Sequence, residues 1–223
     1  MVKIGAITVG QSPRTDVMAD IEPLFRDKAE VLQQGALDGL TKSEINLFAP
    51  VEGDYVLVSR LADGSWVKFA KKHILRRLQS AIDTLTLQGV SAIMMLCTGE
   101  FHDLFVSAVP LLYPDKLLSA VVPAICSKKR IVVLTPDEEQ RAQVQNRWAG
   151  FVQEAVPVIA NPYEGVSAIE RILPVLKALD AGLTVFDCIG YTSEMKRLVQ
   201  KETGWPALLP RTLLAQIACE LTL

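Results

Sequence analysis

The chain has 223 residues, half of them hydrophobic, and a formal charge of −2. This length allows one large α/β domain or two lobes of about 100 residues each. Acids and bases are spread along the chain without a basic block, so a nucleic acid is not expected as a partner. The apolar runs are shorter than the ~20 residues that a membrane span needs, and the cysteine spacing fits neither a zinc site nor a disulfide framework. We therefore expect a cytoplasmic protein with reduced thiols, no membrane association and no metal.

Apolar segments of strand length alternate with amphipathic segments of helix length along the whole chain. We expect strands at residues 3–10, 54–61, 65–70, 90–97, 130–135, 155–160, 183–188 and 206–210. We expect helices at residues 12–27, 70–88, 136–151, 165–182, 193–203 and 211–223. The strands are continuously apolar, which is typical of mainly parallel sheets covered by helices on both faces. The predicted fold class is therefore α/β, with ligands expected beyond the carboxyl ends of the strands.

Local signals mark several element boundaries. Ser12 fits a helix N-cap, with Pro13 in the first helical position. The Asp63-Gly64 pair predicts a tight hairpin turn between two strands. Pro174 is expected to kink or shorten the helix that contains it.

Two cysteines share a context that suggests chemistry. Cys97 and Cys188 each end a predicted strand, and Gly99 and Gly190 follow two residues later. A thiol near the N-terminus of the next helix would have a lowered pKa and favour the thiolate. Two such thiols facing each other across a cleft would act as acid and base on opposite faces of one carbon, as inversion of a stereocentre requires. The alternative is that each cysteine packs as a small buried hydrophobe.

The loop after the first strand has the outline of an anion site. Gly10, Gln11 and Ser12 lead to a helix N-terminus with free N–H groups, and Arg14 follows. The loop matches neither the Walker nor the Rossmann fingerprint. The alternative is a capped helix with a surface arginine.

Further candidates follow the other predicted strands. We expect the threonine hydroxyls among them to hold a carboxylate and the glycines to let the backbone approach it. Thr135 also fits a helix N-cap, Tyr191 would either close a pocket or pack in the core, and Asp187 would orient a ligand or bond the backbone. The full set is Thr98, Gly99, Thr135, Asp187, Gly190, Tyr191 and Thr192.

Three segments of the chain resemble a known family. "ITVGQSPRTD", "RIVVLTPDEEQ" and "VFDCIGYT" are similar to the AroM family of bacterial proteins, and more distantly to the aspartate/glutamate/hydantoin racemase superfamily. In those racemases two strand-end cysteines act as the two bases without a cofactor. The resemblance assigns these roles to Cys97 in "CTG" and Cys188 in "CIG".

The resemblance also implies a domain organisation. It predicts two similar racemase-like lobes with a cleft between them, residues 1–110 and 111–209, with a C-terminal helix at about 210–223 packing back on the first. Relatives with one cysteine include decarboxylases and isomerases, so Cys188 alone would suffice for a single-cysteine lyase.

The leading hypothesis is a cofactor-independent racemase-like or isomerase-like enzyme that transfers a proton on a small carboxylate. The opposing hypothesis is a non-catalytic protein that binds a small anion or has a regulatory role. A third is a redox sensor with one accessible thiolate. The sequence is compatible with a homo-oligomer.

Overall fold

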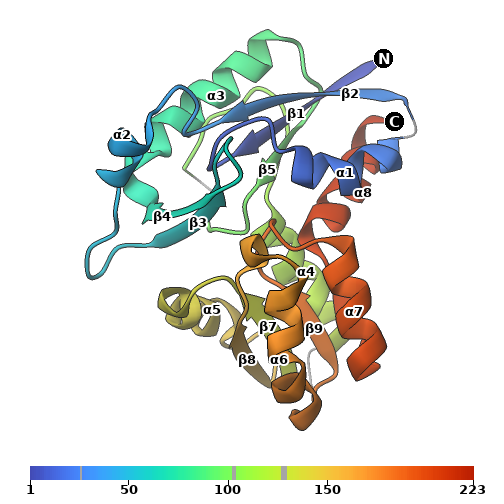
Figure 1. Ribbon diagram of the computed structural model, residues 1–223. Coiled ribbons are helices and arrows are strands. Elements are labelled where there is room, and N and C mark those ends of the chain that lie inside the picture. The colour runs from blue at the N-terminus through green and yellow to red at the C-terminus, as the bar shows by residue number, and fades with distance from the viewer. Residues whose placement is uncertain (26, 102–103, 127–129) are drawn as a thin grey trace. The chain divides into compact units, whose positions relative to one another are not determined.

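The computed structural model describes residues 1–25, 27–101, 104–126 and 130–223. These residues form two compact units. Unit 1 contains residues 1–115 and 211–223, and unit 2 contains residues 116–210. Each unit has a four-stranded sheet in which all neighbouring strands are parallel, so the fold class is α/β as predicted (Figure 1).

The sheet of unit 1 has the strand order β2-β1-β5-β6. Its strands are β1 (Val2–Thr8), β2 (Ala29–Gly35), β5 (Ile93–Leu96) and β6 (Leu111–Leu112). The central strand β1 is buried from Ile4 to its end, which explains why its sequence is continuously apolar. Thr8, its last residue, pairs with Gly35 on one side and with Leu96 on the other.

Helices and a hairpin complete unit 1. They are α1 (Thr15–Phe25), α2 (Lys42–Asn46), the hairpin strands β3 (Val56–Arg60) and β4 (Trp66–Ala70), the 3-10 turn η1 (Lys71–His73), α3 (Leu75–Leu87) and α8 (Pro210–Thr222). Ile7 and Val9 share one core with the buried face of α3. Helix α8 lies beside α1, where the Arg211 guanidinium donates to the Asp16 carbonyl (Figure 1).

Unit 2 repeats the sheet order, as β8-β7-β9-β10. Its elements are α4 (Pro114–Cys126), β7 (Arg130–Thr135), the 3-10 turn η2 (Glu138–Gln140), α5 (Arg141–Trp148), β8 (Glu154–Ile159), the 3-10 turn η3 (Pro162–Glu164), α6 (Val166–Ala178), β9 (Leu183–Phe186), α7 (Ser193–Thr203) and β10 (Ala207–Leu208). Val132 and Leu134 of β7 pack with buried residues of α6 and α7 in a second core. Helix α6 continues through Pro174 to Ala178.

The predicted cap of the first helix is wrong. Helix α1 begins at Thr15, and the Ser12–Pro13 peptide bond that precedes it is cis. The Ser12 hydroxyl donates to the Asp38 carboxylate at 2.6 Å, so it supports a loop instead of a helix end. Within the described parts of the chain, no helix combines the length and the apolar character needed to cross a bilayer.

Candidate active site

The thiol of Cys97 lies directly after β5, in unit 1. The residue is 8% exposed, and its sulfur accepts a hydrogen bond from the Gly99 N–H at 3.4 Å. A side chain at Gly99 would meet Leu57 and Phe101 at about 3 Å, so the turn packs tightly against the hairpin. The sulfur is therefore held at the carboxyl end of the sheet by its own turn, with Thr98 also buried there.

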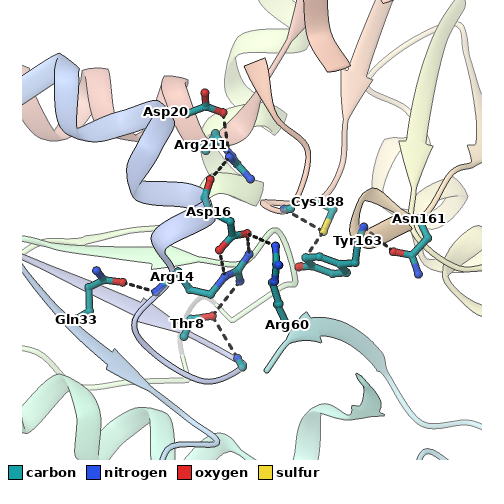
Figure 2. Close-up of polar contacts among 12 residues, drawn as sticks. Thr8, Arg14, Asp16, Asp20, Gln33, Arg60, Asn161, Tyr163, Cys188 and Arg211 are labelled. Atoms are coloured by element: carbon teal, nitrogen blue, oxygen red, sulfur yellow. Dashed lines mark hydrogen bonds and ion pairs between the residues drawn. The ribbon is translucent and has the colours of Figure 1, made fainter. Parts of the chain in front are cut away.

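The thiol of Cys188 has the same arrangement in unit 2. It is 7% exposed, and its sulfur accepts from the Gly190 N–H at 3.4 Å. The Tyr163 hydroxyl lies 3.9 Å from the sulfur, within reach of a weak hydrogen bond (Figure 2). The tyrosine is fixed from two sides, because its N–H donates to the Asn161 side chain and its ring packs against Gly190.

Strand register shows that the two thiols occupy equivalent positions. In unit 1, Thr8 ends the central strand opposite Leu96, and Cys97 comes next. In unit 2, Leu134 pairs with Phe186, so the next residue, Thr135, faces Asp187, and Cys188 follows. In each unit the central strand ends in a threonine, and a neighbouring strand segment contains the residue that faces it. The cysteine is the next residue along that segment.

Asp187, which precedes Cys188, forms a buried ion pair. The Arg147 Nη1 atom donates to both Asp187 carboxylate oxygens, at 2.7 and 2.9 Å, and both side chains are almost fully buried. The Asp187 N–H donates to the Leu134 carbonyl. Together these bonds hold the segment that carries Cys188 against its neighbouring strand.

Tyr191 packs in the core of unit 2. Its side chain is fully buried, its hydroxyl donates to the Ala160 carbonyl, and its ring stacks edge-on against Phe186. Burial raises the pKa of its phenol well above the usual value, and the negative charges of the Cys188 thiolate and of Asp187 add to this effect. Tyr191 therefore supports the strand end as a neutral phenol.

The loop from Gly10 to Arg14 is bonded within unit 1. The Gln11 side chain donates to the Leu37 and Leu40 carbonyls and accepts from the Ala62 N–H. The Ser12 hydroxyl and N–H both donate to Asp38. A side chain at Gly10 would come within 2.3 Å of the Arg60 carbonyl, so glycine is needed where the hairpin approaches. Gln11 and Ser12 therefore fix the loop.

Arg14 belongs to a cluster of three arginines and two aspartates. Its guanidinium is almost fully buried, forms a two-pronged pair with Asp16 at 2.8 and 2.7 Å, and donates to the Thr8 hydroxyl (Figure 2). The buried Arg211 pairs with Asp20 at 2.9 Å. Arg60 is 39% exposed and lies 4.0 Å from Asp16. The cluster therefore contains three guanidinium groups and two carboxylates, an excess of one positive charge.

A pocket of about 240 Å³ opens beside this cluster, within unit 1. It is lined by Pro13, Arg14, Thr15, Asp16, Arg60, Leu61, Ala62 and Gly64. Thr15 and Asp16, the first two residues of α1, are among these lining residues. The pocket is therefore a polar hollow with excess positive charge.

Two predicted threonines bond locally. The Thr192 hydroxyl accepts from the Met195 N–H and caps α7. The Thr135 hydroxyl donates to the Gln140 side chain, whereas the cap of the following turn is Asp137, so the N-cap interpretation of Thr135 is wrong. Thr135 is the last residue of β7, whereas Thr192 lies at the start of α7, beyond the end of β9.

The sequence did not single out Tyr163, Arg147, Arg60 or Asp38 as site residues. Tyr163 lies in "NPYEG", a turn signal with no chemical pattern. Arg60 ends a hairpin strand, a context that the sequence does show. Among the described residues, no three His, Cys, Asp or Glu side chains gather as a metal site would require.

Comparisons with known proteins place the chain in a family. The family described as "AroM protein" matches residues 4–222. The chain belongs to the AroM family. A search of curated proteins finds no match.

Solved structures share the fold of this AroM protein. Aspartate racemase from Picrophilus torridus matches with 14% identity and a TM-score of 0.65, over 100% of this chain and 96% of the racemase. Allantoin racemase from Klebsiella pneumoniae matches with 15% identity and a TM-score of 0.62, over 99% and 87% of the two chains. The maleate isomerase of Pseudomonas putida matches with 14% identity and a TM-score of 0.60, over 98% and 92%. The chain thus has the racemase-like fold.

Proposed function

We propose that this AroM protein is a cofactor-independent enzyme of the racemase and isomerase type, which moves a proton at the carbon beside a carboxylate of a small organic acid. Cys188 is the principal proton carrier, and Cys97 is the second. The racemase-like fold supports the class of chemistry at the level of the superfamily.

The chemistry needs only groups of this chain. A thiolate removes the proton from the carbon beside the carboxylate, and a thiol returns a proton to that carbon. An N–H that donates to sulfur favours the thiolate form, and each thiol has one, from Gly99 or from Gly190. Thr98 and the backbone of the two glycine turns hold the carboxylate, while Gly10, Gln11, Ser12, Thr135, Tyr191 and Thr192 keep the strand ends in place.

One observation carries the proposal. The two thiols occupy equivalent strand positions, with the same N–H bond to sulfur and the same slight exposure. Two cysteines that served only as core hydrophobes would not need the same hydrogen bond at the same place in both units. Cys126, which is equally buried inside α4, lies on no strand end.

Proton exchange in D₂O tests the proposal. Amino acids, hydantoins and malonates are incubated with the protein, and NMR follows deuterium at the carbon beside the carboxylate or, in hydantoins, beside the ring carbonyl. We expect exchange with at least one class, lowered about 10²–10⁴-fold in C188S. C126S is the matched control and should exchange at the wild-type rate. Absence of exchange across all three classes would overturn the proposal.

The variant C97S separates two forms of the mechanism. A racemase needs both thiols, so C97S should lose inversion as fully as C188S does. A single-cysteine lyase or isomerase would keep its turnover in C97S. Measuring inversion and decarboxylation on the same substrates distinguishes these outcomes.

The pocket beside Arg14 and Arg60 favours a second candidate function, the binding of a small anion. Arginine forks fit carboxylates and phosphates, and Arg60 retains the exposure needed to meet one. Malonate and inorganic phosphate should raise the melting temperature of the wild type in a saturable way and should do so much less in R60Q. R76Q, a change of an exposed arginine on α3, is the control. An equal response of R60Q and wild type would exclude this pocket as the site.

A further inference from the structure

The Tyr163 ring packs against the turn that carries Cys188. Its phenolic oxygen lies 3.9 Å from the Cys188 sulfur, and Figure 2 shows the two atoms joined by a contact. A methyl group at Gly190 would come within 2.8 Å of the ring carbons Cε1 and Cζ. Because Cζ carries the hydroxyl, this separate contact places the polar end of the ring at the same turn. Tyr163 therefore meets the thiol with its hydroxyl and not with the edge of its ring alone.

The loop before α6 holds Tyr163 in this position. Asn161 is buried, and its side-chain oxygen accepts a hydrogen bond from the Tyr163 N–H at 2.9 Å. Gly165 ends the 3-10 turn η3 with a φ of +83°, and its N–H donates to the Pro162 carbonyl at 3.2 Å. Tyr163 is half-buried, whereas Cys188 is 7% exposed. The turn therefore fixes where the phenol lies, and the phenol is the more accessible of the two groups.

The contact has a defined direction when the sulfur is ionised. A thiolate has no hydrogen, so the phenol must then be the donor, whereas either atom can donate while the sulfur is a thiol. Hydrogen bonds to an ionised acceptor are about twice as strong as bonds between neutral groups. The Gly190 N–H also donates to the Cys188 sulfur, at 3.4 Å. Two donors therefore converge on the ionised sulfur, and both favour that form over the thiol.

Other groups near Cys188 also affect its ionisation. Asp187 precedes it, and the Arg147 guanidinium pairs with the Asp187 carboxylate at 2.7 Å. Tyr191 follows it, and the charge of the Cys188 thiolate is one of the causes that raise the pKa of that phenol. A change confined to the Tyr163 hydroxyl leaves all of these groups in place. A comparison of variants at Tyr163 therefore isolates the effect of the hydroxyl.

We propose that Tyr163 is a positioning residue for Cys188, whose hydroxyl donates to the sulfur of the thiolate and keeps that sulfur in one orientation. This inference rests on the proposed function, in which Cys188 is the principal proton carrier. The bond weakens when the sulfur takes the proton from the carbon beside the carboxylate, because the acceptor is then neutral. Tyr163 thus acts through the sulfur and exchanges no proton with the substrate.

Alkylation by iodoacetamide tests the inference without a substrate. The rate at Cys188 is measured against pH by mass spectrometry, and the midpoint of the profile gives the pKa of the thiol. Y163F removes the hydroxyl and keeps the ring. We expect Y163F to raise this pKa by about half to one unit, so that the thiolate fraction below the midpoint falls about three- to tenfold. A Y163F profile with the wild-type midpoint would overturn the inference.

The variant Y163L separates the hydroxyl from the ring. It removes both, so it should shift the midpoint as Y163F does and also change the plateau rate at high pH, which reports access to the sulfur. A midpoint that shifts in Y163L and not in Y163F would show that the ring alone matters, which would contradict the proposal.

The next residue and the other thiol provide the controls. Glu164 is exposed and pairs with Arg171, so E164Q should not raise the midpoint of Cys188. Cys97, followed in the same samples, should keep its midpoint in every variant. Equal shifts of Cys97 and Cys188 in Y163F would indicate a general change of structure and would also overturn the inference.

Deuterium exchange separates this inference from the proposed function. With a substrate that exchanges, Y163F should lower kcat about three- to tenfold below the midpoint pH and change KM less, because the hydroxyl acts on the sulfur. If no substrate class exchanges and the midpoint of Cys188 still shifts in Y163F, only the proposed function is overturned.

Discussion

At the residue scale, the buried pair of Arg147 and Asp187 is the strongest constraint on the segment that carries Cys188. Both side chains are nearly inaccessible to water, and two short bonds join them. Removing one partner of such a pair leaves an uncompensated buried charge, which costs far more than the pair itself contributes.

We therefore expect R147M to lower the free energy of unfolding by about 3–5 kcal/mol, as measured by urea denaturation. R197M, a change of an exposed arginine on α7 in the same unit, should stay within about 0.5 kcal/mol of the wild type. A loss of similar size in both variants would show that Asp187 does not depend on Arg147.

Gly190 gives a second prediction at this scale. A methyl group there would come within 2.8 Å of the Tyr163 ring, which must move away. G190A should therefore cost about 1–3 kcal/mol in stability, because it overpacks the turn. The loss of stability caused by G190A should be smaller when Tyr163 is also replaced, in Y163L/G190A. A leucine is smaller and more flexible than a tyrosine, so it can move away from the added methyl group. Additive losses in a double-mutant cycle would contradict this account.

Some of the site residues could be predicted from the sequence, and others could not. Cys97 and Cys188 were predicted at strand ends because apolar runs stop there, and the structure has Cys97 directly after β5 and Cys188 shortly after β9. The partners of Gln11 and Ser12 were not predictable, because Leu37, Asp38 and Ala62 meet them only through the folded chain. Hydrogen-bond partners distant in sequence leave no local pattern.

At the element scale, the start of α1 depends on charge. Burial alone would raise the pKa of Asp16, but the hydrogen bond and the charge of Arg14 lower it, helped by Arg211 and Arg60. The net pKa lies below the usual value. Because the pKa of Asp16 is lower in the folded than in the unfolded protein, its ionised carboxylate stabilises the fold at pH values above the unfolded pKa, near 4. This stabilisation is lost as the pH falls through the pKa of the folded protein.

The variant D16N tests this pH dependence. At pH 7 it should unfold about 1–3 kcal/mol more easily than the wild type, because charge-assisted bonds are lost. The difference should shrink as the pH falls below about 4. E22Q changes an exposed carboxylate on the same helix and should show little difference at either pH. A constant gap between D16N and wild type down to pH 2 would contradict the assignment.

Elements with a single strong local signal were predicted well. Strand β7 and helix α7 have the bounds that the sequence indicates, and the hairpin turns at Asp63-Gly64. Strand β2 was missed because its end, "QQG", is polar and only partly buried at a sheet edge. Helix α4 was missed because it is mostly apolar and contains Pro123, so its sequence does not look like an uninterrupted surface helix.

At the scale of the whole molecule, unit 1 is discontinuous in sequence. Residues 211–223 form part of it, although unit 2 lies between them and residues 1–115. The fully buried Arg211 bonds the Asp16 carbonyl and Asp20, and Cys219 donates to the Leu24 carbonyl. The prediction that the C-terminal helix packs back on the first lobe came from the family resemblance, because contacts across more than 190 positions carry no local signal.

Deleting residues 211–223 should therefore destabilise α1 and its surroundings selectively. Hydrogen exchange followed by mass spectrometry should show faster exchange in residues 15–25, while the strands of unit 2 retain more of their protection. Deleting residues 222–223 alone is the control and should leave residues 15–25 protected. Uniform loss of protection throughout the chain would contradict the assignment of α8 to unit 1.

The return of the chain to unit 1 has a consequence for biosynthesis. A ribosome releases residues 1–115 long before residue 211 is made, because all of unit 2 comes between them. During that interval the carboxylate of Asp20 lacks the guanidinium of Arg211, and the flank of α1 lacks its helical neighbour. Unit 2, which is one continuous segment, can complete its contacts first. We therefore expect the part of the protein that is translated first to mature last.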